Sequence, residues 1–141
     1  MELIDTHCHI YYDDYKNDLG LTDKNLVMGD SGGYQIASGA IKWDMSIRER
    51  IFNWLEHNSD IAMNLDIPPK IKYEGMYEEC LKISKDNFKY FADNQSGNTD
   101  FLNVVQGTND LEYINWYNEM KKNPTFSSLS RLKQIEKNFL Y

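Results

Sequence analysis

A stretch near the start of the chain combines an acid, two glycines and an aromatic residue. It spans residues 29–35, Gly-Asp-Ser-Gly-Gly-Tyr-Gln, and follows a short apolar run. The carboxylate of Asp30 is therefore expected just where a strand ends. The glycines let the backbone turn sharply and approach a ligand without a Cβ in the way. With an aromatic face from Tyr34 and an amide from Gln35, this stretch suits a flat ligand that forms hydrogen bonds.

Two further polar groups follow predicted strands. Residues 60–65 alternate apolar and polar side chains and lead to Asp66, after which Pro68 cannot continue a hydrogen-bonded ladder. Residues 101–105 form a mostly apolar run, short enough for a buried strand, that leads to Gln106. The sequence therefore predicts three polar groups at three successive strand ends.

Helical patterns separate these strands. Ser46 with Glu49 matches a capping box and predicts a helix over residues 46–58. Residues 74–93 are predicted to form a longer helix. Its apolar face is interrupted by one serine. The residues of that face are Tyr77, Leu81, Ser84, Phe88 and Phe91.

The remaining elements follow the same alternation. Strands are expected at residues 2–5 and 25–28, and a loop at 36–43. A helix capped by Asn109 or Asp110 is expected to place four residues on one apolar face. These are Leu111, Ile114, Tyr117 and Met120. A last helical pattern begins near Ser128.

This spacing predicts a single α/β domain over residues 1–141, built from parallel βα units. Asp30 and Asp66 are 36 residues apart, and Asp66 and Gln106 are 40 apart, so each interval holds one helix and one strand. Ligands of parallel sheets bind beyond the carboxyl ends of the strands. The three side chains are therefore expected to face one cleft. The alternative is that the aspartates only cap helices and end strands.

Composition narrows the classes of function. The chain has 141 residues, of which 41% are hydrophobic and 26% charged, as in one ordinary soluble domain. Its net charge of −7 argues against tight binding of nucleic acid through phosphates by this chain alone. Cys8 and Cys80 have no metal or disulfide spacing, which fits a reducing cytoplasm. No long apolar run or targeting segment is seen, so no membrane contact is expected.

Three motifs resemble those of a known family. Residues 30–35, Asp-Ser-Gly-Gly-Tyr-Gln, resemble the signature of the tRNA-guanine transglycosylases, which have a (β/α)₈ barrel and exchange guanine for a 7-deazaguanine base. Residues 59–66, Ser-Asp-Ile-Ala-Met-Asn-Leu-Asp, resemble the family's second acidic strand. Residues 104–107, Val-Val-Gln-Gly, resemble its strand ending in glutamine and glycine. The resemblance covers residues 25–120 and implies a partial TIM-like barrel.

The resemblance also implies roles for individual residues. Asp30 would be the catalytic acid/base group that handles the proton on the incoming or departing base. Asp66 would accept hydrogen bonds from the ring N–H and exocyclic amino group of guanine, and Gln106 would donate to the ring carbonyl. Tyr34 would stack on the ring, unless it is an ordinary core aromatic. The other expected substrate-binding residues are Ser31, Gly32, Gly33, Gln35 and Gly107.

The sequence also departs from the family. The late aspartate nucleophile and the Cys/His zinc site have no counterpart after Gln106, so no cofactor is expected in this chain. A fragment, a split enzyme with a partner chain, a self-associating half-barrel and an inactive relative all fit this pattern. The nucleic acid acted on would be tRNA or DNA.

Two other classes of function stay open. His7 and His9 resemble the HxH pair on the first strand of metal-dependent TIM-barrel hydrolases, where both imidazoles bind a metal that activates water. His57, in a predicted helix, does not complete such a ligand set. The third class is a non-catalytic module that binds guanine or 7-deazaguanine.

Overall fold

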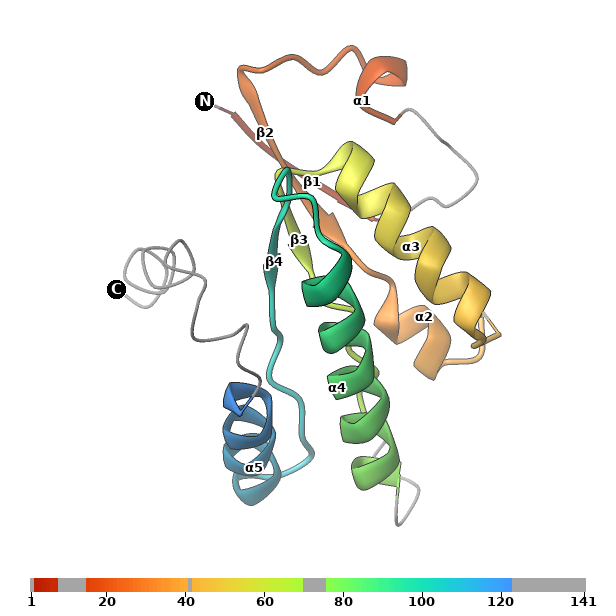
Figure 1. Ribbon diagram of the computed structural model, residues 1–141, viewed down its shortest axis with the longest axis vertical. Helices are drawn as coiled ribbons and strands as arrows, with labels where there is room; N and C mark the ends of the chain where they lie inside the picture. Colours follow the sequence, from red (N-terminus) through yellow and green to blue (C-terminus); the bar gives the residue numbers. More distant parts are fainter. Residues whose placement is uncertain (1, 8–14, 41, 70–75, 123–141) are drawn as a thin grey trace.

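The protein is a mixed α/β structure with one four-stranded sheet (Figure 1). The computed structural model describes residues 2–7, 15–40, 42–69 and 76–122, with side chains from Asn17 onward. The strands lie in sequence order and all three neighbouring pairs are parallel. They are β1 (Glu2–His7), β2 (Asn25–Asp30), β3 (Ile61–Met63) and β4 (Asp100–Leu102). The predicted parallel βα units are therefore confirmed.

Helices occupy the segments between the strands and the segment after β4. They are α1 (Tyr15–Asp18), α2 (Gly33–Ala37), α3 (Met45–Asn58), α4 (Met76–Asn94) and α5 (Asp110–Lys121). The short helix α2 begins within the glycine-rich stretch, at its last glycine, and extends into the start of the predicted loop. The two glycines allow this turn, because Gly32 has a φ of 79° in the left-handed region.

One face of the sheet carries the hydrophobic core. Phe52 of α3, Phe91 of α4 and Phe101 of β4 meet there, with ring centroids 5.0 to 5.7 Å apart. Trp116 of α5 belongs to the same buried cluster. Helices α3 and α4 therefore cover this face, and α5 packs against α4; Figure 1 shows α3 and α4 along one flank of the sheet.

The strands alternate between this core face and the opposite face. In β2, Val27 and Gly29 are buried, whereas Leu26, Met28 and Asp30 are half-buried. A Cβ at Gly29 would lie 2.7 Å from Leu55 of α3, which identifies the core side of the strand. Asp30 therefore lies on the face of β2 turned away from α3.

The structure corrects the predicted N-cap of one helix and confirms that of another. The N-cap of α3 is Asp44, whose Oδ1 accepts from the backbone N–H of Ile47 at 2.9 Å and from Ser46 Oγ at 2.6 Å. Ser46 thus supports the cap and does not form it, because the carboxylate two residues earlier is the stronger acceptor. The N-cap of α5 is Asn109, as one of the two predicted alternatives.

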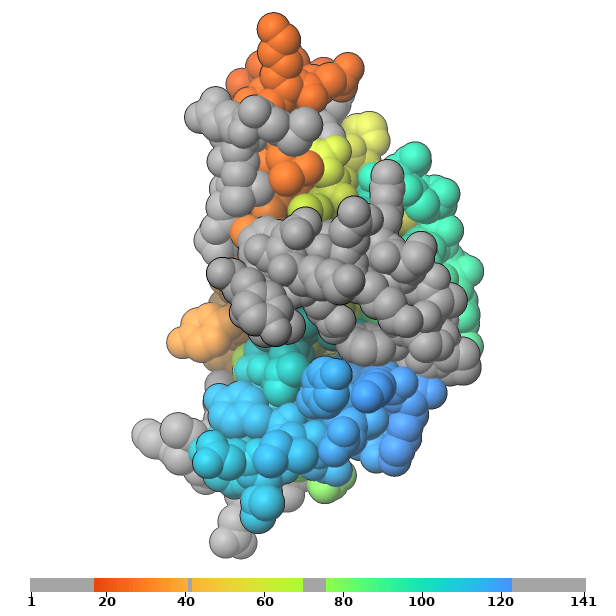
Figure 2. All heavy atoms as spheres, turned by 90° about the vertical axis from the view of Figure 1, so that its left-hand side faces the viewer, coloured from red at the N-terminus to blue at the C-terminus, as the bar shows by residue number. Residues whose placement is uncertain are grey.

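The predicted apolar face of α5 is also wrong. Leu111, Ile114 and Tyr117 are 79%, 59% and 41% exposed, and α5 forms the blue surface in Figure 2. Trp116 and Met120 are buried instead, because the Trp116 ring packs 6.0 Å from that of Tyr77 on α4. Only Met120 of the predicted face points into the core.

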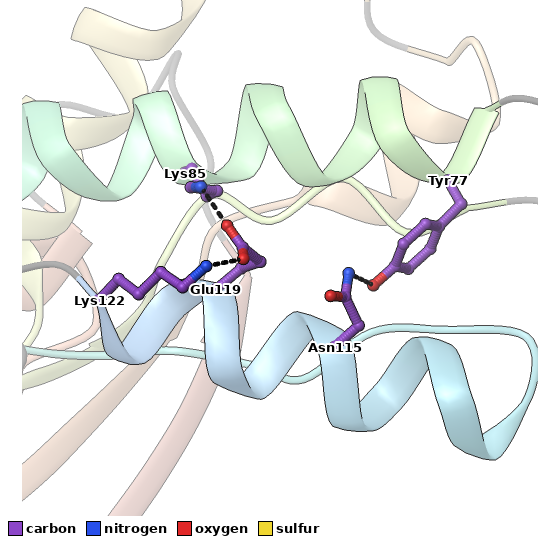
Figure 3. A network of polar contacts seen from close by, with 5 residues as sticks. All are labelled: Tyr77, Lys85, Asn115, Glu119 and Lys122. Atoms are coloured by element: carbon purple, nitrogen blue, oxygen red, sulfur yellow. Dashed lines mark hydrogen bonds and ion pairs between the residues drawn. The ribbon is translucent and has the colours of Figure 1, made fainter.

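Polar contacts between α4 and α5 fix this orientation (Figure 3). The Tyr77 hydroxyl donates to the Glu112 carbonyl at 2.8 Å and accepts from Asn115 Nδ2 at 2.9 Å. Glu119 pairs with Lys122 and, at 2.7 Å, with Lys85. Neighbouring Lys122 and Lys85 lower the pKa of Glu119 to about 2.

Two strands are shorter than predicted. Regular pairing ends at Met63 in β3 and at Leu102 in β4, although the Asn64 N–H still donates to the Leu102 carbonyl at 2.7 Å. The stretch from Ser128 lies outside the described residues. None of the helices in the described ranges is both long and apolar enough to cross a membrane.

Candidate functional site

The candidate site lies at the carboxyl ends of the strands. Asp30 is the last residue of β2, and its register partner in β1 is His7. Asp66 and Gln106 follow β3 and β4 in irregular segments. Since neighbouring strands are parallel, their carboxyl ends share one edge of the sheet, which is the usual location of ligands in such folds.

A side-chain hydrogen bond joins two of the predicted site residues. Gln106 Nε2 donates to Asp66 Oδ2 at 2.5 Å, across forty residues of sequence. A carboxylate only accepts hydrogen bonds, so the amide nitrogen of Gln106 must face it. The contact confirms that the segments after β3 and β4 converge.

The Asp66 carboxylate is held away from water. The residue is 7% exposed, and its burial raises the pKa to about 6. The hydrogen bond from Gln106 opposes this rise, whereas the nearby charge of Asp30 adds to it. Asp30 is thus close enough to Asp66 to affect its ionisation. At neutral pH Asp66 is mainly ionised and is a hydrogen-bond acceptor.

The glycine-rich stretch packs directly against the Asp66 segment. A Cβ at Gly33 would lie 1.8 Å from the Asp66 carbonyl oxygen, which leaves no room for a side chain. Ser31 is 1% exposed, and its Oγ donates to the Asn64 carbonyl at 2.9 Å. The Gly32 N–H donates to Asp30 Oδ1 at 3.3 Å. The residues predicted to line a pocket therefore also join β2 to the segment after β3.

Tyr34 and Gln35 have different surroundings. Tyr34 is 72% exposed, so the alternative of a core aromatic is wrong. Its ring is available for stacking on a ligand. The Oε1 atom of Gln35 is buried and has no hydrogen-bond partner within the described part of the chain. This acceptor is open to a hydrogen bond from a water or a ligand.

The packing of the fold requires a glycine at position 107. A Cβ there would lie 2.8 Å from the backbone nitrogen of Tyr113 in α5. The close approach that this glycine permits is therefore to the first turn of α5. The sequence alone suggested close approach to a ligand.

Two residues of α4 contact the Asp66 segment and were not predicted as site residues. Ser84 bonds to Ile67, and Asn87 bonds to Leu65. The signal in the sequence was the polar interruption that Ser84 makes in an apolar helix face. Asn87 gave no comparable signal, because its neighbours in space come from another element.

The described residues contain no cluster of three or more His, Cys, Asp or Glu side chains that could hold a metal ion. His9 and Cys8 lie outside the described residues, as does the side chain of His7. A separate polar groove of about 460 Å³ lies between α4 and α5 and includes Lys85, Asn115 and Glu119. It contains none of the strand-end residues.

No protein-family model, no curated protein and no solved structure matches the chain. The function is therefore inferred from the fold and from the strand-end site.

Proposed function

We propose that this chain is a transglycosylase-like protein, and that its strand-end site recognises guanine or a 7-deazaguanine base for exchange in tRNA or DNA. The observation that carries the proposal is the contact between Asp66 and Gln106, with Asp30 close by. These residues come from three βα units and were predicted to meet on the basis of motifs in the order found in tRNA-guanine transglycosylases.

The chemistry of the contact suits a guanine edge. Guanine presents a ring N–H and an exocyclic amino group side by side, next to a ring carbonyl. The Asp66 carboxylate has two oxygens that each accept more than one hydrogen bond, so Gln106 leaves acceptor capacity for both donors. The second N–H of the Gln106 amide is the natural donor to the ring carbonyl.

Asp30 and Tyr34 supply the other roles. Tyr34 follows Gly33 in the chain, is exposed, and would stack on the ring, as aromatic side chains do with flat ligands. Asp30 would give and take the proton of the departing and incoming bases. The Gln35 Oε1 atom offers a buried acceptor to a further ligand N–H.

We further infer that the sheet is part of a (β/α)₈ barrel. Doubly wound sheets place strands out of sequence order and helices on both faces, whereas barrels keep sequence order with helices outside. The order β1-β2-β3-β4 and the shared core of α3, α4 and α5 favour the barrel. Asp30, on the face away from α3, would then face the barrel interior.

Exchange of a base also requires a nucleophile that attacks the sugar. The residues after Gln106 include no counterpart of the family's nucleophile and contain no Cys or His for its zinc site. We propose that the nucleophile comes from other residues, either in a longer chain or in a partner such as another copy of this chain. Without that nucleophile the site binds the base and leaves the glycosidic bond intact.

Calorimetric titration with guanine and 7-deazaguanine tests the site. The wild-type protein is expected to bind, and Asp66→Ala to lose binding, because the two-donor edge of the base loses its acceptor. Asp86→Ala is the matched control, since it removes an exposed aspartate of α4 outside the site. Unchanged affinity of Asp66→Ala would contradict the proposal.

Labelled-guanine exchange into tRNA and into DNA separates catalysis from binding. Incorporation by the protein, alone or with a partner, supports the transglycosylase. Base binding without incorporation under any condition instead favours the non-catalytic module. A stoichiometric metal that is lost when His7 and His9 are both changed to Ala would favour the hydrolase.

A further inference from the structure

Helix α4 buries two polar side chains against the sheet. Ser84 and Asn87 are both 0% exposed, on a face that also buries Leu81, Phe88 and Phe91. A helix face packed on a sheet is stabilised mainly by apolar side chains. Two fully buried polar residues on this face therefore require specific partners.

Their partners are the peptide groups on either side of Asp66. Ser84 Oγ accepts from the Ile67 N–H at 2.8 Å and donates to the Cys80 carbonyl at 2.7 Å. Asn87 Nδ2 donates to the Leu65 carbonyl at 2.8 Å. The backbone before and after Asp66 is thus bound to α4.

No regular ladder holds this segment, because β3 ends at Met63. Asp66 is a short side chain with few torsions, so a shift of its backbone moves the carboxylate by a similar distance. Gln106 bonds to the carboxylate itself, and Gly33 packs against the Asp66 carbonyl. The α4 contacts bind both peptide groups that flank Asp66, whereas Gly33 touches only the carbonyl of the second one.

We propose that Ser84 and Asn87 are positioning residues that hold the Asp66 carboxylate where it binds the base. This inference rests on the proposed function for its ligand, but the contacts that support it do not depend on the ligand. Small displacements of a positioned group weaken recognition strongly, because hydrogen bonds to a buried carboxylate depend on geometry.

The alternative is that both residues only satisfy buried backbone groups. In that case their loss lowers stability and leaves the surroundings of the carboxylate unchanged. A positioning role predicts instead that water reaches the carboxylate once the segment is released. The pKa of Asp66 would then fall from about 6 toward its ordinary value of 3.8, since burial is the main cause of its rise.

The test follows the Asp66 carboxyl carbon by NMR across a pH titration and measures guanine affinity by calorimetry. Ser84→Ala and Asn87→Ala are expected to lower the titration midpoint and to weaken guanine binding about tenfold. Ser84→Thr keeps the hydroxyl and is expected to restore both. Ser84→Cys keeps the volume with a weaker acceptor and replaces Ser84→Ala if that variant does not fold.

Thr99→Val is the matched control. Thr99 is 1% exposed, and its Oγ1 donates to the Ser59 carbonyl at 2.7 Å before β4 begins, at the opposite end of the strands from Asp66. This control is expected to lose stability without moving the midpoint. An equal shift in Thr99→Val, or no shift in folded Ser84→Ala and Asn87→Ala, would overturn the positioning role. The titration needs no ligand, so a wild-type protein that fails to bind guanine contradicts the proposed function alone.

Discussion

Asp66 is a carboxylate whose burial destabilises the fold while it serves the proposed site. Removing an ionised group from water disfavours its charged form. Among the described residues, only Gln106 donates a side-chain hydrogen bond to the carboxylate and so offsets part of this cost. Perturbed ionisation of a buried acid in a cleft is typical of functional residues. The buried charge of Asp66 is therefore expected to lower the stability of the fold and to contribute to ligand recognition.

The pH dependence of stability follows from this pKa. The folded state holds the Asp66 proton up to pH about 6, whereas the unfolded state releases it near pH 3.8. Between these values the folded state binds more protons, so stability falls as pH rises and becomes constant above the upper value. The difference between the two pKa values corresponds to about 3 kcal/mol.

Asp66→Asn is expected to raise the free energy of unfolding at pH 8 by up to about 3 kcal/mol, because it removes the buried charge and keeps an acceptor for Gln106. The same change is expected to abolish guanine binding. Urea denaturation at pH 4 and pH 8 measures the first effect, with Asp86→Asn as control. A variant less stable than wild type at pH 8 would show that the buried charge carries no such cost.

Gly33→Ala tests the contact between the glycine-rich stretch and Asp66. The added Cβ would meet the Asp66 carbonyl at 1.8 Å, and such overpacking costs about 1–3 kcal/mol or more. Gly39→Ala is the control: its Cβ meets nothing within 4 Å, and only its φ of 81° is strained. Thermal unfolding should rank Gly33→Ala as the less stable variant, and guanine binding should fall only there. The reverse ranking would contradict the contact.

At the scale of the element, α5 shows how packing overrides periodicity. Leu111, Ile114 and Tyr117 are spaced as an apolar face, yet Trp116 and Met120 are buried. The larger indole removes more apolar surface from water, and the Tyr77 hydroxyl bonds to Glu112 and Asn115 only in this orientation. Where a helix has apolar residues on more than one side, the element that packs against it therefore decides which side is buried.

Substitutions on the two faces of α5 distinguish the alternatives. Trp116→Ala is expected to cost about 3–5 kcal/mol, as for other buried aromatic side chains. Ile114→Ser is expected to change stability by about 0.5 kcal/mol or less, because the side chain is 59% exposed. Chemical denaturation measures both. A larger loss of stability in Ile114→Ser than in Trp116→Ala would show that the face predicted from periodicity is the buried one.

At the scale of the whole molecule, net charge limits the partners. A charge of −7 repels the phosphate backbone, so tRNA binding by this chain alone is expected to be weaker than about 10⁻⁴ M at physiological salt. Fluorescence anisotropy with labelled tRNA tests this, with free guanine as the ligand control. Micromolar, salt-dependent binding would instead reveal a local basic surface that the overall charge conceals.

The alternation of strands and helices was readable from the sequence because it depends on local patterns. Apolar runs of strand length, the helical spacing on α4 and the turn at the glycines each specify their element through nearby residues. The strands of residues 60–65 and 101–105 ended earlier than expected, because β-pairing depends on a partner strand as well as on apolar side chains.

By itself the sequence determined the parallel βα arrangement and the convergence of Asp66 with Gln106, since parallel strands bring their carboxyl ends to one edge. Only the tertiary structure decided which face of α5 is buried, why Gly107 must be small, and which residues hold Asp66 in place. Ser84, Asn87 and Gly33 contact the Asp66 segment from distant parts of the chain. Apart from the polar interruption that Ser84 makes in its helix face, these contacts leave no periodic signal, because they depend on packing between elements.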